Sequence, residues 1–134
     1  MVFYMNKEIL GLGWKKFKDN LYPFFSENSW IIILWSVTAV MDAYSTCLFM
    51  QVTGPDGELH PLTRVCSAEI GIYAGPYISG TLKFLMALPL LVCYKQLAKY
   101  VLGLGCVFQF YAYHYNVSVF EFLSRRVSPE YWFI

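Results

Sequence analysis

Two side chains of opposite charge stand near the middle of two long apolar segments. Asp42 is the only charged residue in 30–52, and Lys83 is the only one in 70–94. A lone charge at the centre of a membrane helix costs roughly 2.5–3.5 kcal/mol on insertion scales, and an opposite charge beside it removes much of that cost. We predict that Asp42 and Lys83 form an intramembrane ion pair that fixes the register of a helical hairpin. An ion or proton site, or contact of either residue with a partner subunit, are the alternatives.

A polar loop over 53–69 joins these two segments. It opens with Gly54-Pro55-Asp56-Gly57, which is a strong turn signal. The stretch Glu58-Leu59-His60-Pro61-Leu62 follows, and we take Glu58, His60 and Pro61 as its motif. The loop is short for a folded domain outside the membrane.

A histidine stands in a third apolar segment, 97–120, where His114 lies between Tyr113 and Tyr115. A lone histidine inside a membrane can ligate a haem or a chlorophyll, or hydrogen-bond a neighbouring helix. A haem with two protein ligands needs a second ligand at the same depth, and the other histidine, His60, lies in the loop. Three interpretations stay open: hydrogen bonding on a packed face, one axial ligand to a pigment, and a cofactor or contact completed by a partner.

No catalytic constellation is visible in the sequence. It lacks G-x-S-x-G, H-E-x-x-H and a glycine-rich phosphate loop. Ser45, Thr46, Asp42 and Lys83 could be assembled into a serine/lysine hydrolase, but their spacing does not require one. The four cysteines show no C-x-x-C spacing. Three of them lie in apolar segments, where cysteine is typically a small buried hydrophobic residue, and Cys66 alone lies in the polar loop. We therefore predict a protein that is not an enzyme and holds no metal.

The composition is that of a membrane protein. Hydrophobic residues make up 57% of the chain and charged residues 14%, whereas soluble domains have about 25% charged residues. About 20 apolar residues cross a hydrocarbon core, and 30–52, 70–94 and 97–120 each have that length. The net charge of +1 gives no electrostatic basis for binding nucleic acid. We predict an all-α fold, with one membrane domain, 1–134, and three transmembrane helices.

Small and amide side chains mark the faces on which these helices are expected to pack. Small residues recur on the first two spans, as Ser36, Ala39, Ala43 and Cys47 on one and as Gly75, Ser79 and Ala87, with Lys83, on the other. Small stripes let membrane helices approach closely, so we expect these two faces to meet. In the third span, Gln109 and Asn116 are predicted to hydrogen-bond across helices.

The N-terminal segment 6–21 has the pattern of an amphipathic helix. Its apolar face is formed by Leu10, Trp14, Phe17 and Leu21. Trp14 with Lys15, Lys16 and Lys18 suits a helix that lies in the membrane interface, with its lysines toward anionic headgroups. Docking on a partner subunit is the alternative. Pro23 is expected to break this helix.

The distribution of Lys and Arg around the spans predicts the orientation. With the N-terminus inside, six of them lie inside, namely Lys7, Lys15, Lys16, Lys18, Lys95 and Lys99, and three lie outside, namely Arg64, Arg125 and Arg126. We predict N-terminus inside and C-terminus outside, in a bacterial inner membrane or an equivalent energy-transducing membrane. The N-terminus lacks the pattern of a signal peptide, so the first span is expected to be an uncleaved anchor.

The hairpin pattern resembles a family of small bacterial and archaeal multi-pass membrane proteins of unknown function. Members of that family have an Asp and a following Thr in one span, then Gly and Glu-Leu-Asn-Pro-Leu in the loop, then Lys in the next span. The corresponding residues here are Asp42, Thr46, Gly57, Glu58-Leu59-His60-Pro61-Leu62 and Lys83. The resemblance covers about 30–94, departs from the pattern at His60, and implies the hairpin but no reaction.

These observations favour a non-catalytic accessory subunit of a larger membrane complex, of the respiratory or photosynthetic type, that stabilises the complex or fills an interface. Its partners would be other membrane subunits and the lipid bilayer. Bound lipids, or a pigment near His114, are the cofactors that would fit. A small oligomeric transporter that handles ions or protons at Asp42 and Lys83, or an assembly factor, is the alternative.

Overall fold

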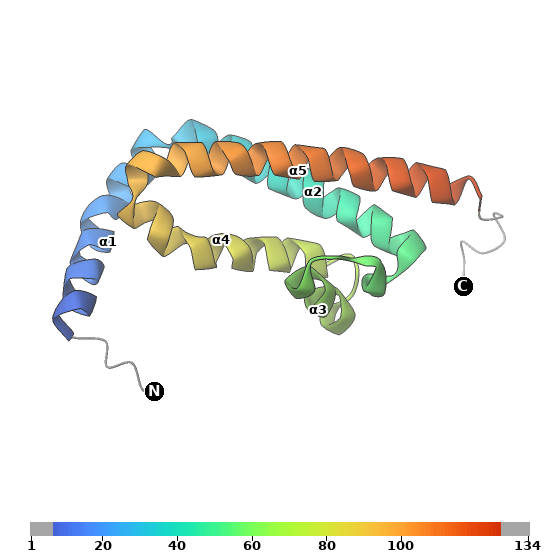
Figure 1. Ribbon diagram of the computed structural model, residues 1–134, viewed down its shortest axis with the longest axis horizontal. Coiled ribbons are helices and arrows are strands. Elements are labelled where there is room, and N and C mark those ends of the chain that lie inside the picture. Colours follow the sequence, from blue (N-terminus) through green and yellow to red (C-terminus); the bar gives the residue numbers. More distant parts are fainter. Residues whose placement is uncertain (1–6, 127–134) are drawn as a thin grey trace.

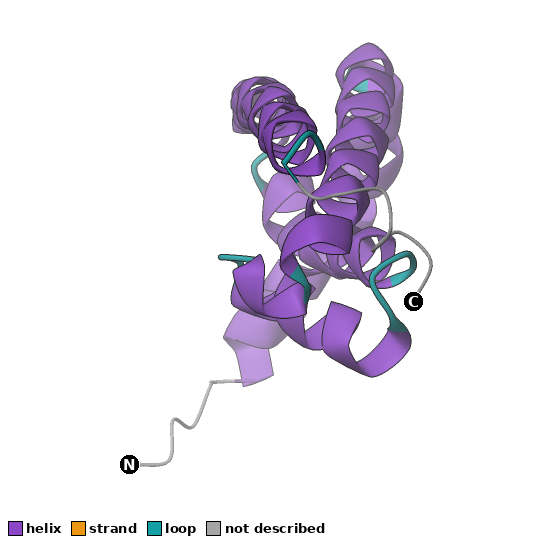
Figure 2. Cartoon of the chain, turned by 90° about the vertical axis from the view of Figure 1, so that its right-hand side faces the viewer, coloured by secondary structure: helices purple, strands orange, loops and turns teal. Residues whose placement is uncertain are grey.

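The computed structural model describes residues 7–126, which are helical except for short connections (Figures 1 and 2). The elements are α1 (Lys7–Glu27), α2 (Ser29–Thr53), the short 3₁₀ helix η1 (Pro55–Gly57), α3 (Pro61–Ile70), α4 (Gly75–Cys93) and α5 (Lys95–Ser124). The predicted all-α class is therefore confirmed.

Within the described part of the chain, two helices, α2 and α4, are long and apolar enough to cross a membrane. They correspond to the predicted spans 30–52 and 70–94, although α4 begins at Gly75. Pro76 lies in the first turn of α4, as expected, where its missing N–H breaks no hydrogen bond. Helix α5 covers the predicted span 97–120 but is not one of these two helices. Gln109, His114 and Asn116 interrupt its apolar sequence.

Helix α1 corrects the expectation that Pro23 ends the N-terminal helix. It continues through Pro23 to Glu27, whereas the predicted end was residue 21; the predicted start, Asn6, lies outside the described residues. Phe24, the residue after Pro23, is fully buried in the core. The free energy gained by burying Phe24 offsets the cost of the helix hydrogen bond that is lost at Pro23. Asn28 then separates α1 from α2, and its side-chain Nδ2 donates to the Phe24 carbonyl oxygen at 3.0 Å.

The connection between α2 and α4 is more ordered than a plain loop. Gly54, with φ of 71°, ends α2, because a left-handed backbone favours glycine. Pro61 then lies in the first turn of α3, and Gly71, with φ of 94°, ends this helix. Helix α3 was not predicted, because ten residues give too short a pattern to separate from a polar loop.

Helices α2 and α5 lie side by side and run in the same direction, while α4 diverges from α5 (Figure 1). Thr38 Oγ1 donates to Gln109 Oε1 at 2.6 Å, and Asn116 Nδ2 donates to Ser45 Oγ at 3.3 Å and to Thr46 Oγ1 at 3.2 Å. The predicted interhelical role of Gln109 and Asn116 is confirmed. The pairs Thr38–Gln109 and Ser45–Asn116 are each 71 residues apart, so one offset aligns both helices.

The apolar core lies where α1, α2, α4 and α5 meet, around the turn between α4 and α5. Its buried members are Phe24, Ile31, Leu91, Val92, Ala98, Leu102 and Cys106. Trp35 packs against this cluster, and its ring lies 4.7 Å from the ring of Phe84. Gly105 gives the indole room, because a Cβ at this position would lie 3.1 Å from Trp35 Nε1.

We expect Gly105→Val to destabilise the protein by roughly 1–3 kcal/mol, because the added side chain forces Trp35 out of its packed position. Thermal unfolding in a mild detergent, followed by Trp fluorescence, measures this change. Gly103→Val is the matched control, since a Cβ at Gly103 meets no atom within 4 Å. Equal melting temperatures for the two variants would contradict the packing of Gly105 on Trp35.

Candidate functional site

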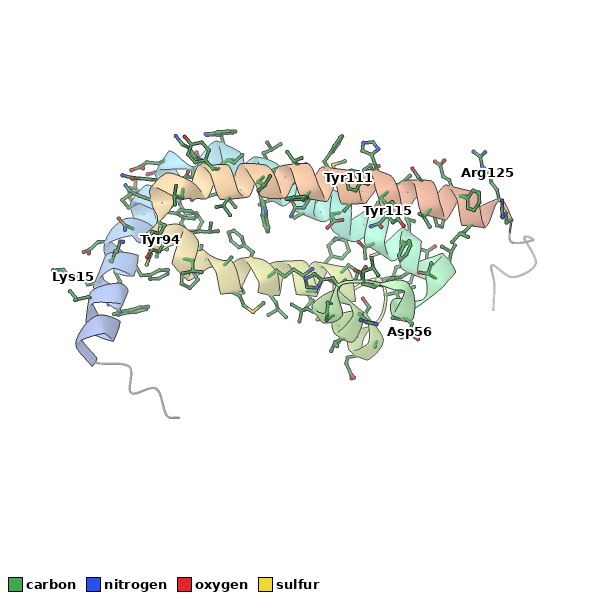
Figure 3. All side chains as sticks on the ribbon, in the orientation of Figure 1. Lys15, Asp56, Tyr94, Tyr111, Tyr115 and Arg125 are labelled. Carbon is green, nitrogen blue, oxygen red and sulfur yellow. The ribbon has the colours of Figure 1, made fainter. Side chains whose placement is uncertain are left out.

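Most of the chemistry-bearing residues predicted from the sequence converge on one pocket of about 540 Å³ at the α3 end of the bundle. Its charged and polar lining comes from Asp42, Thr46, Glu58, His60, Thr63, Lys83 and Asn116, and its aromatic lining includes Phe49, Tyr111 and Tyr115. In Figure 3, Tyr111 and Tyr115 lie on α5, and Asp56 lies in η1, below them in this view. We refer to this as the polar pocket.

Lys83 is held in the polar pocket by a hydroxyl of α3. Its Nζ donates to Thr63 Oγ1 at 2.9 Å, and Thr63 Oγ1 lies 3.0 Å from Ser79 Oγ. Ser79 Oγ in turn donates to the Pro76 carbonyl oxygen at 2.9 Å. This chain of polar contacts fixes the position of the ammonium group on α4.

The small face of α4 makes this arrangement possible, but it packs differently from the prediction. Gly75 lies against Ser67 of α3, where a Cβ would overlap the Ser67 backbone. Thus Gly75 and Ser79 pack on α3, whereas the sequence predicted that they face the first span. On the α2 side, Ala39 and Ala43 of the predicted stripe line a second pocket together with Gly80 of α4, which is not a residue of the predicted face.

Asp42 and Lys83 share the polar pocket without the predicted direct ion pair. Among the described residues, the one salt bridge within 4.0 Å joins Lys95 Nζ and Glu27 Oε1, at 2.7 Å. The Asp42 side chain accepts no hydrogen bond from the described residues, although its backbone carbonyl accepts one from Ser45 Oγ. The physical reason is that the Lys83 ammonium is bound by Thr63 of α3 instead.

The loop motif forms the start of α3. Glu58 Oε1 accepts a hydrogen bond from the His60 backbone N–H at 2.8 Å. His60 is extended, with φ of −82° and ψ of 116°, as expected for a residue before proline. Partial burial lowers the pKa of His60 from its ordinary 6.5, and the positive charge of Lys83 lowers it further, while Glu58 raises it. The imidazole is therefore neutral at pH 7.

Sequence reasoning missed Thr63 and the pocket-lining aromatic residues. Tyr111 and Tyr115 are one helical turn apart on α5, so their shared face was readable. Their position in the pocket with Asp42 could not be predicted from the sequence, because it depends on the offset of 71 residues between α2 and α5. Thr63 lies on a helix that the sequence did not predict.

His114 lies apart from the polar pocket. Its ring makes edge contacts with Phe110, at 4.5 Å between centroids, and with Tyr113, at 5.4 Å, and the residue is exposed. No described residue hydrogen-bonds the imidazole, so residues 7–126 do not provide the hydrogen bond on a packed face that was one of the three interpretations. The described part of the chain contains no group of three or more His, Cys, Asp or Glu that could hold a metal ion.

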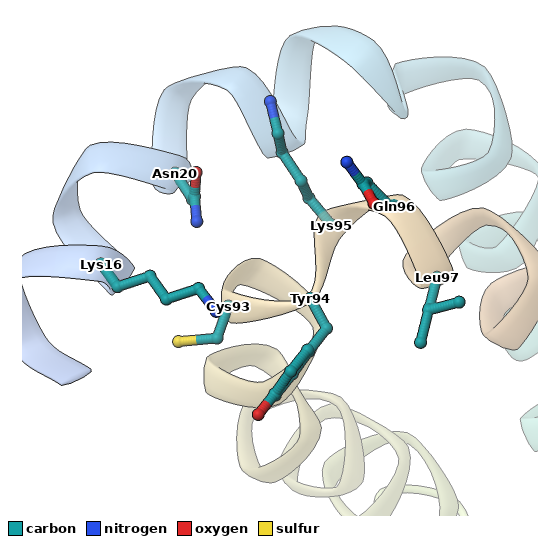
Figure 4. A pocket seen from close by; sticks show the side chains of 7 residues that line it. All are labelled: Lys16, Asn20, Cys93, Tyr94, Lys95, Gln96 and Leu97. Carbon is teal, nitrogen blue, oxygen red and sulfur yellow. The ribbon is translucent and has the colours of Figure 1, made fainter.

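The predicted interfacial residues lie at the opposite end of the molecule. Trp14, Lys15, Lys16 and Lys18 are all exposed on α1. Lys16 Nζ lies 4.7 Å from the Tyr94 ring centre, at a pocket of about 460 Å³ that also includes Lys95 (Figure 4). This end therefore carries exposed lysines and aromatic rings together.

Comparisons with protein-family models, with curated proteins and with solved structures return no match. The resemblance to the family of small membrane proteins stays a prediction, and the residues and geometry of this chain carry the functional argument.

We expect Lys83→Met to raise the pKa of His60 part of the way toward 6.5, because it removes a nearby positive charge but not the partial burial. An NMR titration of the His60 ring in detergent micelles measures this value. Lys99→Met is the control, since Lys99 lies on the far end of α5 and is expected to leave the His60 pKa unchanged. Identical titration curves for the wild type and Lys83→Met would contradict the shared pocket.

Proposed function

We propose that the protein is a non-catalytic, three-span integral membrane protein that acts as an accessory subunit of a larger membrane complex. The length and apolar character of α2 and α4 support two spans. The offset of 71 residues places 100–124 of α5 beside 29–53 of α2, which supports the same depth for α5. The exposed lysines of α1 support an interfacial position and an N-terminus on the inner side of the membrane.

The observation that carries the accessory role is the outer face of α5, defined by Tyr100, Gly103, Val107, Phe110 and His114. These residues follow one another at intervals of three and four, so they form one stripe along the helix. Tyr100 and Val107 are 66% and 64% exposed, and the space over Gly103 is open. A glycine on such a stripe lets another membrane helix approach closely.

His114 favours a protein partner over lipid on this face. The offset of 71 puts it level with Ala43, near the middle of α2. An imidazole in hydrocarbon without a hydrogen-bond partner is unfavourable, and the described chain supplies no such partner. A neighbouring subunit that hydrogen-bonds His114, or that holds a pigment against it, would remove this cost. A respiratory or photosynthetic complex is the proposed setting.

The polar pocket favours a second candidate, an oligomeric protein that handles ions or protons at Asp42 and Lys83. The distribution of charged residues argues against this candidate, because they lie only toward one end of α2 and α4. From the polar pocket toward α1, α2 has no charged residue before Asp42, and α4 has none after Lys83. The accessory role is therefore the better supported proposal; an assembly factor would use the same outer face transiently.

We expect a photo-crosslinking amino acid at position 114 to give discrete adducts with one or two membrane proteins in native membranes. The crosslinking group would take the place of the His114 ring, in the proposed interface with the partner. Met86, which is 65% exposed on α4, is the control position and is expected to give none of these adducts. Gel electrophoresis and mass spectrometry of the adducts identify the partner. The same adducts from both positions, or none from position 114, would overturn the assigned interface.

A further inference from the structure

Helices α4 and α5 meet at Tyr94 and diverge from there (Figure 1). Residues of both helices contribute to two pockets. The polar pocket lies at the wide end. An apolar pocket of about 400 Å³ lies at the narrow end, with Leu90 and Tyr94 before the turn and Leu97 and Val101 after it. We call these two pockets, together with the exposed face of α5 between them, the α4–α5 groove.

One face of α5 connects the two pockets. Leu97, Val101, Leu104 and Phe108 follow one another at intervals of four, three and four, and Tyr111 and Tyr115 continue the series into the polar pocket. All six side chains are more than half exposed. The groove is therefore apolar at Tyr94 and charged at Lys83, about 16 Å apart along α4 at 1.5 Å per residue.

We infer that the α4–α5 groove binds a zwitterionic aminophospholipid, with its ammonium and phosphate in the polar pocket and an acyl chain along the apolar face. This site is independent of the partner interface proposed for the outer face of α5. The phospholipid carries a positive and a negative group a few bonds apart, and the polar pocket contains side chains of both charges.

The missing Asp42–Lys83 ion pair is the main argument for a ligand with both charges. Thr63 holds Lys83 by one of the three N–H groups of its ammonium, so two donors are free for phosphate oxygens. The Asp42 carboxylate receives no hydrogen bond from the described residues and is free to accept N–H groups of an ammonium. Because the protein keeps the two charges apart, each is available to the opposite charge of a zwitterion.

The other residues of the polar pocket favour the same ligand. Glu58 supplies a second carboxylate, so the acids outnumber Lys83 while His60 is neutral. Phe49, Tyr111 and Tyr115 supply aromatic rings, which attract cations. The volume of about 540 Å³ lies in the range of ligand sites. A primary ammonium fits better than a quaternary one, because its N–H groups can donate to both carboxylates.

The test uses the full chain reconstituted in vesicles of equal parts phosphatidylethanolamine, phosphatidylcholine and phosphatidylglycerol. The protein is extracted in a mild detergent, and the lipids retained per chain are counted by native mass spectrometry. We expect phosphatidylethanolamine to be retained preferentially. Retention in proportion to the vesicle composition would overturn the proposal.

Variants then locate the bound lipid. Asp42→Asn is expected to lower the retention of phosphatidylethanolamine roughly ten-fold, because it removes a charge-assisted hydrogen bond. Asp56→Asn is the matched control, since Asp56 is an exposed acid of the same end that does not line the polar pocket. Glu58→Gln, in the loop, is expected to lower retention as well, and it decides the question if Asp42→Asn does not fold. Equal retention in Glu58→Gln and Asp56→Asn would contradict the site.

A second pair of variants separates binding of the whole lipid from binding of its headgroup. Val101→Trp fills the apolar part of the groove and is expected to lower retention, whereas Val107→Trp, on the outer face, is expected to leave it unchanged. Displacement of the lipid by soluble phosphoethanolamine at equal concentration would show that the acyl chain contributes nothing and would overturn the groove as a lipid site.

Discussion

The parallel contact between α2 and α5 sets the positions of the other helices, and hydrogen bonds between polar side chains define its register. Gln109 and Asn116 each meet hydroxyl groups of α2 at the same offset of 71 residues. One such bond between membrane helices contributes only about 0.6–2 kcal/mol. A shift by one turn in either direction, however, would put one of the two amides opposite an apolar side chain, Leu34 for Gln109 or Phe49 for Asn116, which costs several kcal/mol in the hydrocarbon of the proposed membrane. The register is therefore defined more sharply than the stabilising energy of the bonds suggests.

The position of α4 follows from this contact. It leaves the core at Val92 and diverges from α5, and its first turns lie against α3, where Gly75 contacts Ser67, and beside Ala39 and Ala43 of α2. The close approach of Gly75 to Ser67 brings Thr63 to Lys83, and the ammonium of Lys83 is hydrogen-bonded away from Asp42. The result is a pocket that keeps opposite charges apart beside an apolar groove. The outer face of α5, with His114, is left exposed by the other described residues.

The sequence predicted the parts of the fold that depend on local pattern. Apolar length identified α2 and α4, and the amide side chains of α5 identified its hydrogen-bonding face. Tertiary contacts decided the rest. Burial of Phe24 carries α1 past Pro23, and packing on α4 makes a helix of 61–70. The residues of the polar pocket were largely recognised, but the ion pair was wrong, because charge and depth do not reveal that Thr63 binds Lys83.

The most direct test of this account is the register of α2 on α5. Ile31 and Leu102, also 71 residues apart, are both buried in the same core cluster. In a chain whose native cysteines are replaced by alanine, Ile31→Cys with Leu102→Cys is expected to form a disulfide rapidly on mild oxidation in membranes. Ile31→Cys with Cys106 restored, one turn further along α5, is expected to react more slowly. Faster reaction of the second pair, or no reaction of the first, would contradict the parallel contact on which the polar pocket and the groove depend.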